Sequence, residues 1–128
     1  MTRQTDIAAL ERLIRWPAKP ESAVWQTRTI GEGTDWALLA VLTYAPGEMT
    51  AVLASAPETP GLDGAVMFMP FDWTDVTVIP GLVIAADGSA TVVGGSRSAE
   101  AFLSSPLTDG FVLAIPGQNQ VLVFLYTS

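Results

Sequence analysis

The last eighteen residues of the chain, 111–128, constrain the fold most strongly. They read FVLAIPGQNQVLVFLYTS, so two apolar runs flank the turn-forming sequence PGQN at 116–119. A turn of this composition between two β-prone segments predicts a β-hairpin. If Ile115 pairs with Gln120, bulky side chains share one face and small ones the other, because directly opposed residues lie on the same face of a sheet.

Both faces of this hairpin are apolar. The bulky face would carry Phe111, Leu113, Leu122 and Phe124, and the small face Val112, Ala114, Val121 and Val123. Strands that are apolar on both faces lie in a sheet that is covered on both sides. We expect the N-terminal helix to cover the bulky face and a second copy of the chain to cover the small face. This makes Val112, Val121 and Val123 interface candidates in a homodimer.

The N-terminal segment 6–16 has the pattern of an amphipathic helix. Ile7, Leu10, Leu13 and Ile14 recur at helical spacing, charged side chains lie opposite, and a proline follows at position 17. Such a stripe predicts a helix that packs on the sheet.

Further along, the β-prone segment 23–30 has a polar face and predicts an edge strand, whereas 36–44, WALLAVLTY, predicts a central one. The segment 46–56 favours a short helix with a proline in its first turn. Asp-Gly at 87–88 predicts a hairpin over 82–93, because these residues adopt the positive φ angles of a tight turn. A second short helix is expected over 97–103.

These elements predict one α+β domain over residues 1–128. We expect an antiparallel sheet of five or six strands, with the N-terminal amphipathic helix and one or two short helices packed on it. The segment 65–79 has no clear period, and the strand order cannot be derived from the pattern.

The chain contains neither histidine nor cysteine. Imidazole-dependent catalysis, thiolate nucleophiles and the common zinc sites are therefore excluded. Asp72 and Asp75 flank Trp73, but carboxylates at this spacing are typical of a solvated turn, and no calcium-binding pattern surrounds them. We expect no catalytic residue, no metal and no cofactor.

The charge is distributed unevenly along the chain. Residues 1–30 hold five of the six basic residues and three of the thirteen carboxylates, whereas residues 31–128 hold one basic residue and ten carboxylates, a net charge of −9. Such a body repels nucleic acids and anionic lipids, and it attracts a basic protein partner. No apolar run approaches the roughly 20 residues of a membrane-spanning helix. No secretion signal is recognisable either, so a cytoplasmic location is expected.

Three groups of residues are candidate sites. The tryptophans Trp16, Trp25 and Trp73 are interface candidates, because exposed tryptophans often anchor protein contacts. The apolar side chains of Met67, Phe68, Met69, Phe71 and Trp73 could line a ligand pocket, or they could fill an irregular core. Gly94, Gly95, Ser96 and Arg97 open the second short helix and could bind an anion, although ordinary N-capping after a flexible connection is the favoured explanation.

Together these features favour a non-enzymatic, acidic protein-binding module of the inhibitor, immunity or secretion-chaperone type, and a homodimer. The alternative is a domain that binds a small hydrophobic ligand between helix and sheet.

Overall fold

The computed structural model describes residues 3–30, 35–59, 67–71, 73, 79, 81–115 and 117–127. Within this part of the chain the strands form two antiparallel sheets, one of five strands and one of three, and the helices are short. The expected α+β class with an antiparallel sheet is confirmed, whereas the second sheet was not foreseen. None of the helices in the described residues is long and apolar enough to cross a membrane.

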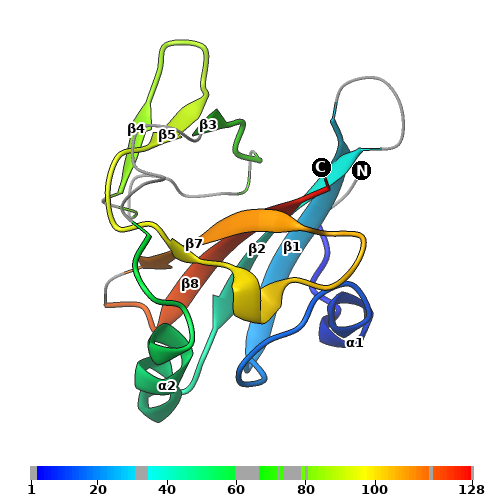
Figure 1. The fold of residues 1–128 in the computed structure, drawn as a ribbon, viewed down its shortest axis with the longest axis vertical. Helices are drawn as coiled ribbons and strands as arrows, with labels where there is room; N and C mark the ends of the chain where they lie inside the picture. Colours follow the sequence, from blue (N-terminus) through cyan, green and yellow to red (C-terminus); the bar gives the residue numbers. More distant parts are fainter. Residues whose placement is uncertain are drawn as a thin grey trace.

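The main sheet has the strand order β1-β2-β8-β7-β6 (Figure 1). Its strands are β1 (Ser22–Thr29), β2 (Trp36–Thr43), β8 (Gln120–Tyr126), β7 (Asp109–Ile115) and β6 (Arg97–Ser98). The predicted edge strand is therefore at an edge, and the predicted central strand lies between β1 and β8. All neighbouring strands are antiparallel.

The closing hairpin has the predicted register. Ile115 pairs with Gln120, and the pairs Leu113 with Leu122 and Phe111 with Phe124 follow from it. The bulky and small faces therefore exist as expected. Because β8 also pairs with β2 and β7 also pairs with β6, both hairpin strands lie inside the sheet and neither is an edge.

The small sheet has the order β3-β5-β4, with β3 at Met67–Phe68, β5 at Ala90–Val92 and β4 at Leu82–Ile84. The predicted hairpin over 82–93 supplies its central strand β5 and one edge strand, β4. Gly88 has a φ of 91°, as the tight turn requires. Hydrogen bonds from the Ser89 backbone and hydroxyl to the Asp87 carboxylate stabilise this turn, and they lower the pKa of Asp87.

The small face of the main sheet is covered by the short helices. These are α1 (Ile7–Glu11), the 3-10 turn η1 (Pro46–Glu48), α2 (Met49–Ala54) and the 3-10 turn η4 (Glu100–Phe102). Their buried side chains Leu10, Val52 and Phe102, with Ile14 just after α1, share one apolar cluster with Val112, Val121 and Val123. The chain therefore covers this face by itself, without a second copy.

The bulky face is covered by the small sheet, which Figure 1 shows on the side of the main sheet opposite α1 and α2. Phe68, Ala90 and Val92 of the small sheet share a second cluster with Phe111, Leu113 and Leu122. The prediction that the N-terminal helix covers the bulky face is wrong, because α1 packs on the other side. When both faces of a sheet are apolar, the sequence does not indicate which element packs on each face.

The N-terminal helix is also shorter than the predicted helix over 6–16, since α1 spans Ile7–Glu11 and its C-cap is Arg12. The backbone N–H of Arg15 donates to the carbonyl oxygen of Phe102 at 3.0 Å, so a contact with η4 replaces the next helical hydrogen bond. Tertiary pairing therefore ends the helix before the apolar stripe does.

The predicted helix over 97–103 is a short strand followed by a 3-10 turn. Arg97 pairs with Val112 and Ser98 with Phe111, which adds β6 to the exposed edge of β7. Only Glu100–Phe102 is helical. Backbone pairing with a neighbouring strand outweighs the helical preference of this segment.

Candidate functional site

The three valines proposed as interface residues are buried inside the chain. Val112, Val121 and Val123 are each 0% exposed, beneath the helices. The prediction that they contact a partner is therefore wrong.

The tryptophan candidates differ in exposure. Trp25 is 7% exposed and its Nε1 donates to the carbonyl oxygen of Asp6 at 3.1 Å, so it belongs to the core. Trp16 packs against the same cluster and is partly exposed. Trp73 is partly buried as well, and its Nε1 donates to Oε1 of Gln26 at 2.8 Å.

Phe71 and Trp73 hold their segment against the edge strand β1. Their rings are stacked with an interplanar angle of 6° and centroids 5.8 Å apart. The guanidinium of Arg28 lies 3.9 Å from the centroid of the Phe71 ring, a cation-π contact. Burial lowers the pKa of Arg28. Both aromatic side chains therefore have structural partners within the chain.

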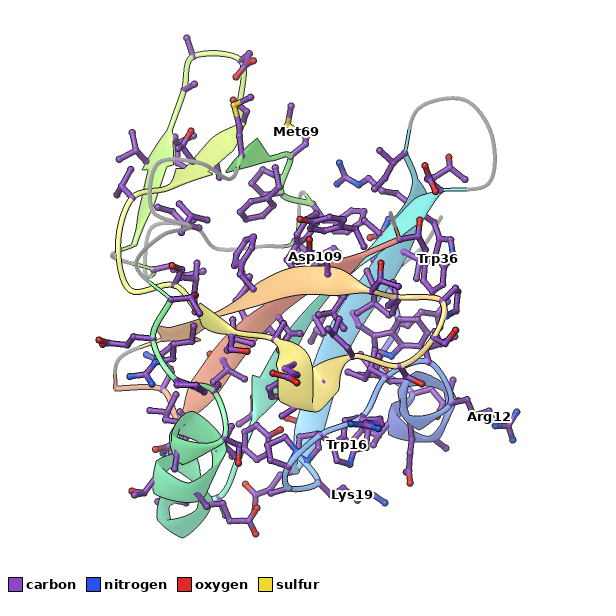
Figure 2. The ribbon with its side chains drawn as sticks, in the orientation of Figure 1. Arg12, Trp16, Lys19, Trp36, Met69 and Asp109 are labelled. Atoms are coloured by element: carbon purple, nitrogen blue, oxygen red, sulfur yellow. The ribbon has the colours of Figure 1, made fainter. Side chains whose placement is uncertain are left out.

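The proposed pocket residues point in different directions. Phe68 is buried, with its ring centroid 5.5 Å from that of Phe111 and 5.0 Å from that of Phe124. Met67 and Met69 are 67% and 45% exposed, and Figure 2 shows Met69 pointing away from the main sheet. These side chains do not converge on one pocket.

The four residues proposed as an anion site do not converge either. The Ser96 hydroxyl is buried and donates to the Thr59 carbonyl at 2.9 Å. Nη1 of Arg97 donates to the carbonyl oxygens of Leu53 and Ala56, at 3.3 and 3.1 Å, and Nη2 lies 3.9 Å from a Glu58 oxygen. Gly94 and Gly95 have open space around them. The Arg97 guanidinium thus satisfies one carbonyl in the last turn of α2 and one just beyond its C-terminus.

Replacing Arg97 with methionine is expected to lower the free energy of unfolding by about 1 to 3 kcal/mol, because two carbonyl groups lose a charged donor. Urea denaturation measures this loss. Arg97→Lys is the matched control for charge, and we expect it to recover only part of the stability, since an ammonium lacks the fork geometry of guanidinium. An Arg97→Met protein as stable as the parent would show that these hydrogen bonds contribute nothing.

The carboxylates Asp72 and Asp75 lie outside the described residues. Among the residues that the structure describes, no group of three carboxylates is arranged to hold a metal ion.

Sequence reasoning missed an apolar surface on the small sheet. Met67 and Val83 both pair with Thr91, which aligns the three side chains across the sheet on the face opposite the buried Ala90 and Val92. Val93 follows on the same face, and Met67, Val83 and Val93 are 67%, 56% and 46% exposed. We call Met67, Val83, Thr91 and Val93 the outer face. Alternation of side chains over residues 90–93 is the sequence pattern that corresponds to this face. The segment is short, however, and three of the four residues 90–93 are apolar, so the pattern is weak.

A second feature that the sequence did not indicate is a cleft of about 530 Å³ beside η4 and the start of β7. It is lined by Thr59, Ser98, Ala99, Glu100, Leu103, Asp109 and Gly110. Two of the lining residues are acidic and come from different elements, Glu100 from η4 and Asp109 from β7. We call it the acidic cleft.

Comparisons with protein families, with characterised proteins and with solved structures gave no match for this chain.

Proposed function

We propose that the protein is a non-enzymatic protein-binding module that uses the outer face of the small sheet. The observation that supports this proposal most directly is the exposure of Met67, Val83 and Val93 on one face of a sheet whose other face is packed in the core. Aligned apolar side chains that remain in water are typical of a surface that a partner covers.

Charge defines the kind of partner. Residues 31–128 carry a net charge of −9, so a basic protein is attracted over long distances and an acidic one is repelled. A small acidic domain that covers a basic surface of another protein fits the inhibitor, immunity or secretion-chaperone type. We further propose that it acts in the cytoplasm.

A homodimer would need a contact surface other than the small face that the sequence predicted. The small face of the main sheet no longer supports it, because the helices cover that face. A second copy would have to bind an exposed apolar surface such as the outer face. Two copies of this chain each carry a net charge of −7, however, so they repel one another. A basic partner of another sequence is therefore favoured over self-association.

The alternative of a small hydrophobic ligand has no comparable support. Phe68 packs against Phe111 and Phe124, and the two methionines beside it face outward. The aromatic pair Phe71 and Trp73 is stacked on itself.

The test compares two variants of the full chain in affinity capture from the source cell at low and at high salt. Met67→Ser with Val83→Ser removes apolar area from the outer face without changing charge. Ile30→Ser removes an apolar side chain that is 40% exposed just after β1 and serves as the matched control. We expect the double variant to bind the captured basic partner at least about tenfold more weakly, a loss of about 1.4 kcal/mol, and the control to bind normally.

Equal capture by the double variant and the parent would contradict the outer face as the binding surface. Light scattering at several concentrations separates the two kinds of occupant. A dimer that the Met67→Ser and Val83→Ser changes dissociate would assign the outer face to a second copy instead of a basic partner.

A further inference from the structure

Strand β4 forms one edge of the small sheet. Among the described strands its only neighbour is β5, and Figure 1 shows it on the outer side of the sheet. The strand is short, but over residues 82–84 it contains no charged residue and no proline, which commonly protect an edge strand from pairing with another chain. Val83 and Ile84 are 56% and 43% exposed. This edge is therefore apolar and open to solvent.

The register of β4 shows which of its backbone groups the small sheet uses. The N–H of Ala85 donates to the carbonyl oxygen of Ser89 at 2.9 Å, so Ala85 faces β5. Along an antiparallel pair, alternate residues direct their N–H and carbonyl groups to the same neighbour. Val83 therefore also faces β5, whereas Leu82 and Ile84 direct their backbone groups away from it.

Three of these outward groups are available to a partner. The N–H of Leu82 donates to the carbonyl oxygen of Ile79 at 3.3 Å and is already used. The carbonyl of Leu82 and both backbone groups of Ile84 have no hydrogen-bond partner within the part of the chain that the structure describes. Water binds such groups in the free protein, and the backbone of an extended segment can replace that water.

The side chains at this edge are apolar on both faces of the small sheet. Val83 lies on the outer face beside Met67, since both residues pair with Thr91. Ile84 pairs with Ala90 and lies on the opposite face, where Ala90 is 0% exposed but Ile84 is 43% exposed. A strand added along β4 would therefore remove apolar surface from water on both faces at once.

We infer that β4 binds an extended segment of the basic protein partner, which pairs with it as an additional strand of the small sheet. This inference rests on the proposed function, because it specifies how the partner proposed for the outer face binds. An extended segment is favoured over a helix, because the backbone groups of a helix already bond to one another. Its alternate side chains would continue the outer face and cover Ile84.

Charge favours a basic segment over a second copy of β4. Asp87 lies in the turn that follows β4, it is exposed, and its hydrogen bonds with Ser89 favour the ionised carboxylate. A segment with lysine or arginine beside its apolar residues brings opposite charge to this turn. Two copies of the chain would instead bring together two molecules that each carry a net charge of −7.

The first experiment titrates the protein with the peptide acetyl-Lys-Val-Thr-Val-Thr-Lys-amide and measures hydrogen exchange of the Ile84 N–H by NMR. We expect this exchange to slow at least about tenfold with peptide at up to about 10 mM, because strand addition gives the N–H a carbonyl acceptor. Two comparison peptides carry either N-methyl groups on the four central residues or glutamate in place of lysine. Both should leave the exchange rate unchanged.

The second experiment uses variants of Ile84 in affinity capture of the basic partner. Ile84→Pro removes the outward N–H and leaves the pairing of Val83 with Thr91 in place. Ile84→Ala shortens the same side chain but keeps the N–H, so it is the matched control. We expect capture to weaken at least about tenfold in Ile84→Pro and at most about threefold in Ile84→Ala. Circular dichroism confirms that both variants are folded.

Unchanged exchange at Ile84 with the basic peptide, or equal capture by Ile84→Pro and Ile84→Ala, would overturn the inference. If the Met67→Ser and Val83→Ser protein loses its partner while Ile84→Pro binds normally, the partner covers the outer face without adding a strand. The proposed function then stands and only this inference fails. The reverse result would support strand addition and contradict the outer face. A dimer of the parent that Ile84→Pro dissociates would overturn the choice of a basic partner in favour of a second copy.

Discussion

Replacing Leu122 with aspartate is expected to abolish folding. Leu122 is 0% exposed, at the centre of the cluster between the two sheets, where it pairs with Leu113 on one side and Val41 on the other. A carboxylate at this place has no partner, and an unpaired buried charge costs several kcal/mol against a total stability of about 5 to 15 kcal/mol. Circular dichroism with urea denaturation measures the result, and Gln118→Asp in the exposed turn of the same hairpin is the matched control.

The same substitution at Val123 distinguishes the covered small face from a dimer contact. Val123 is also 0% exposed, but it faces the helices. We expect Val123→Asp to prevent folding as completely as Leu122→Asp does, because both faces are covered within one chain. A soluble, cooperatively folded Val123→Asp monomer would contradict this arrangement. The small face would then again be a candidate contact surface for a second copy.

The second large effect is expected at Gly110. A Cβ atom added here would overlap the carbonyl oxygen of Phe124 and lie 2.9 Å from Cα of Leu125, so backbone atoms of β8 would have to move. The φ of 157° also lies in a region that favours glycine. Gly110→Ala is therefore expected to lower the free energy of unfolding by about 3 kcal/mol or more.

Thermal and urea denaturation of Gly110→Ala should be compared with Gly94→Ala, where an added Cβ meets nothing within 4 Å. We expect the control to remain close to the parent. If Gly110→Ala has the same free energy of unfolding as the parent, β7 and β8 can move apart at this position without loss of stability.

The hairpin register was predictable because alternation is a strictly local property. Once Ile115 opposes Gln120, the geometry of an antiparallel pair assigns every other side chain to a face. The turn at Asp87 and Gly88 was predictable for a similar reason, since few residues adopt its backbone angles.

The candidate sites were predicted less well because they depend on contacts between distant segments. Arg97 resembles part of an anion site in sequence, but in three dimensions it donates to carbonyl groups more than forty residues away. Glu100 and Asp109 gave no signal in sequence, and they line one cleft only because β6 and η4 fold back beside β7.

By itself, the sequence determined that two strands near the C-terminus are apolar on both faces, that the chain is acidic beyond residue 30, and that imidazole and thiolate chemistry are excluded. Only the tertiary structure decided what covers each face, with α1, α2 and η4 on the small face and the small sheet on the bulky one. The physical reason is that burial of apolar surface is non-directional, so a local pattern records that a face is buried but not by which partner.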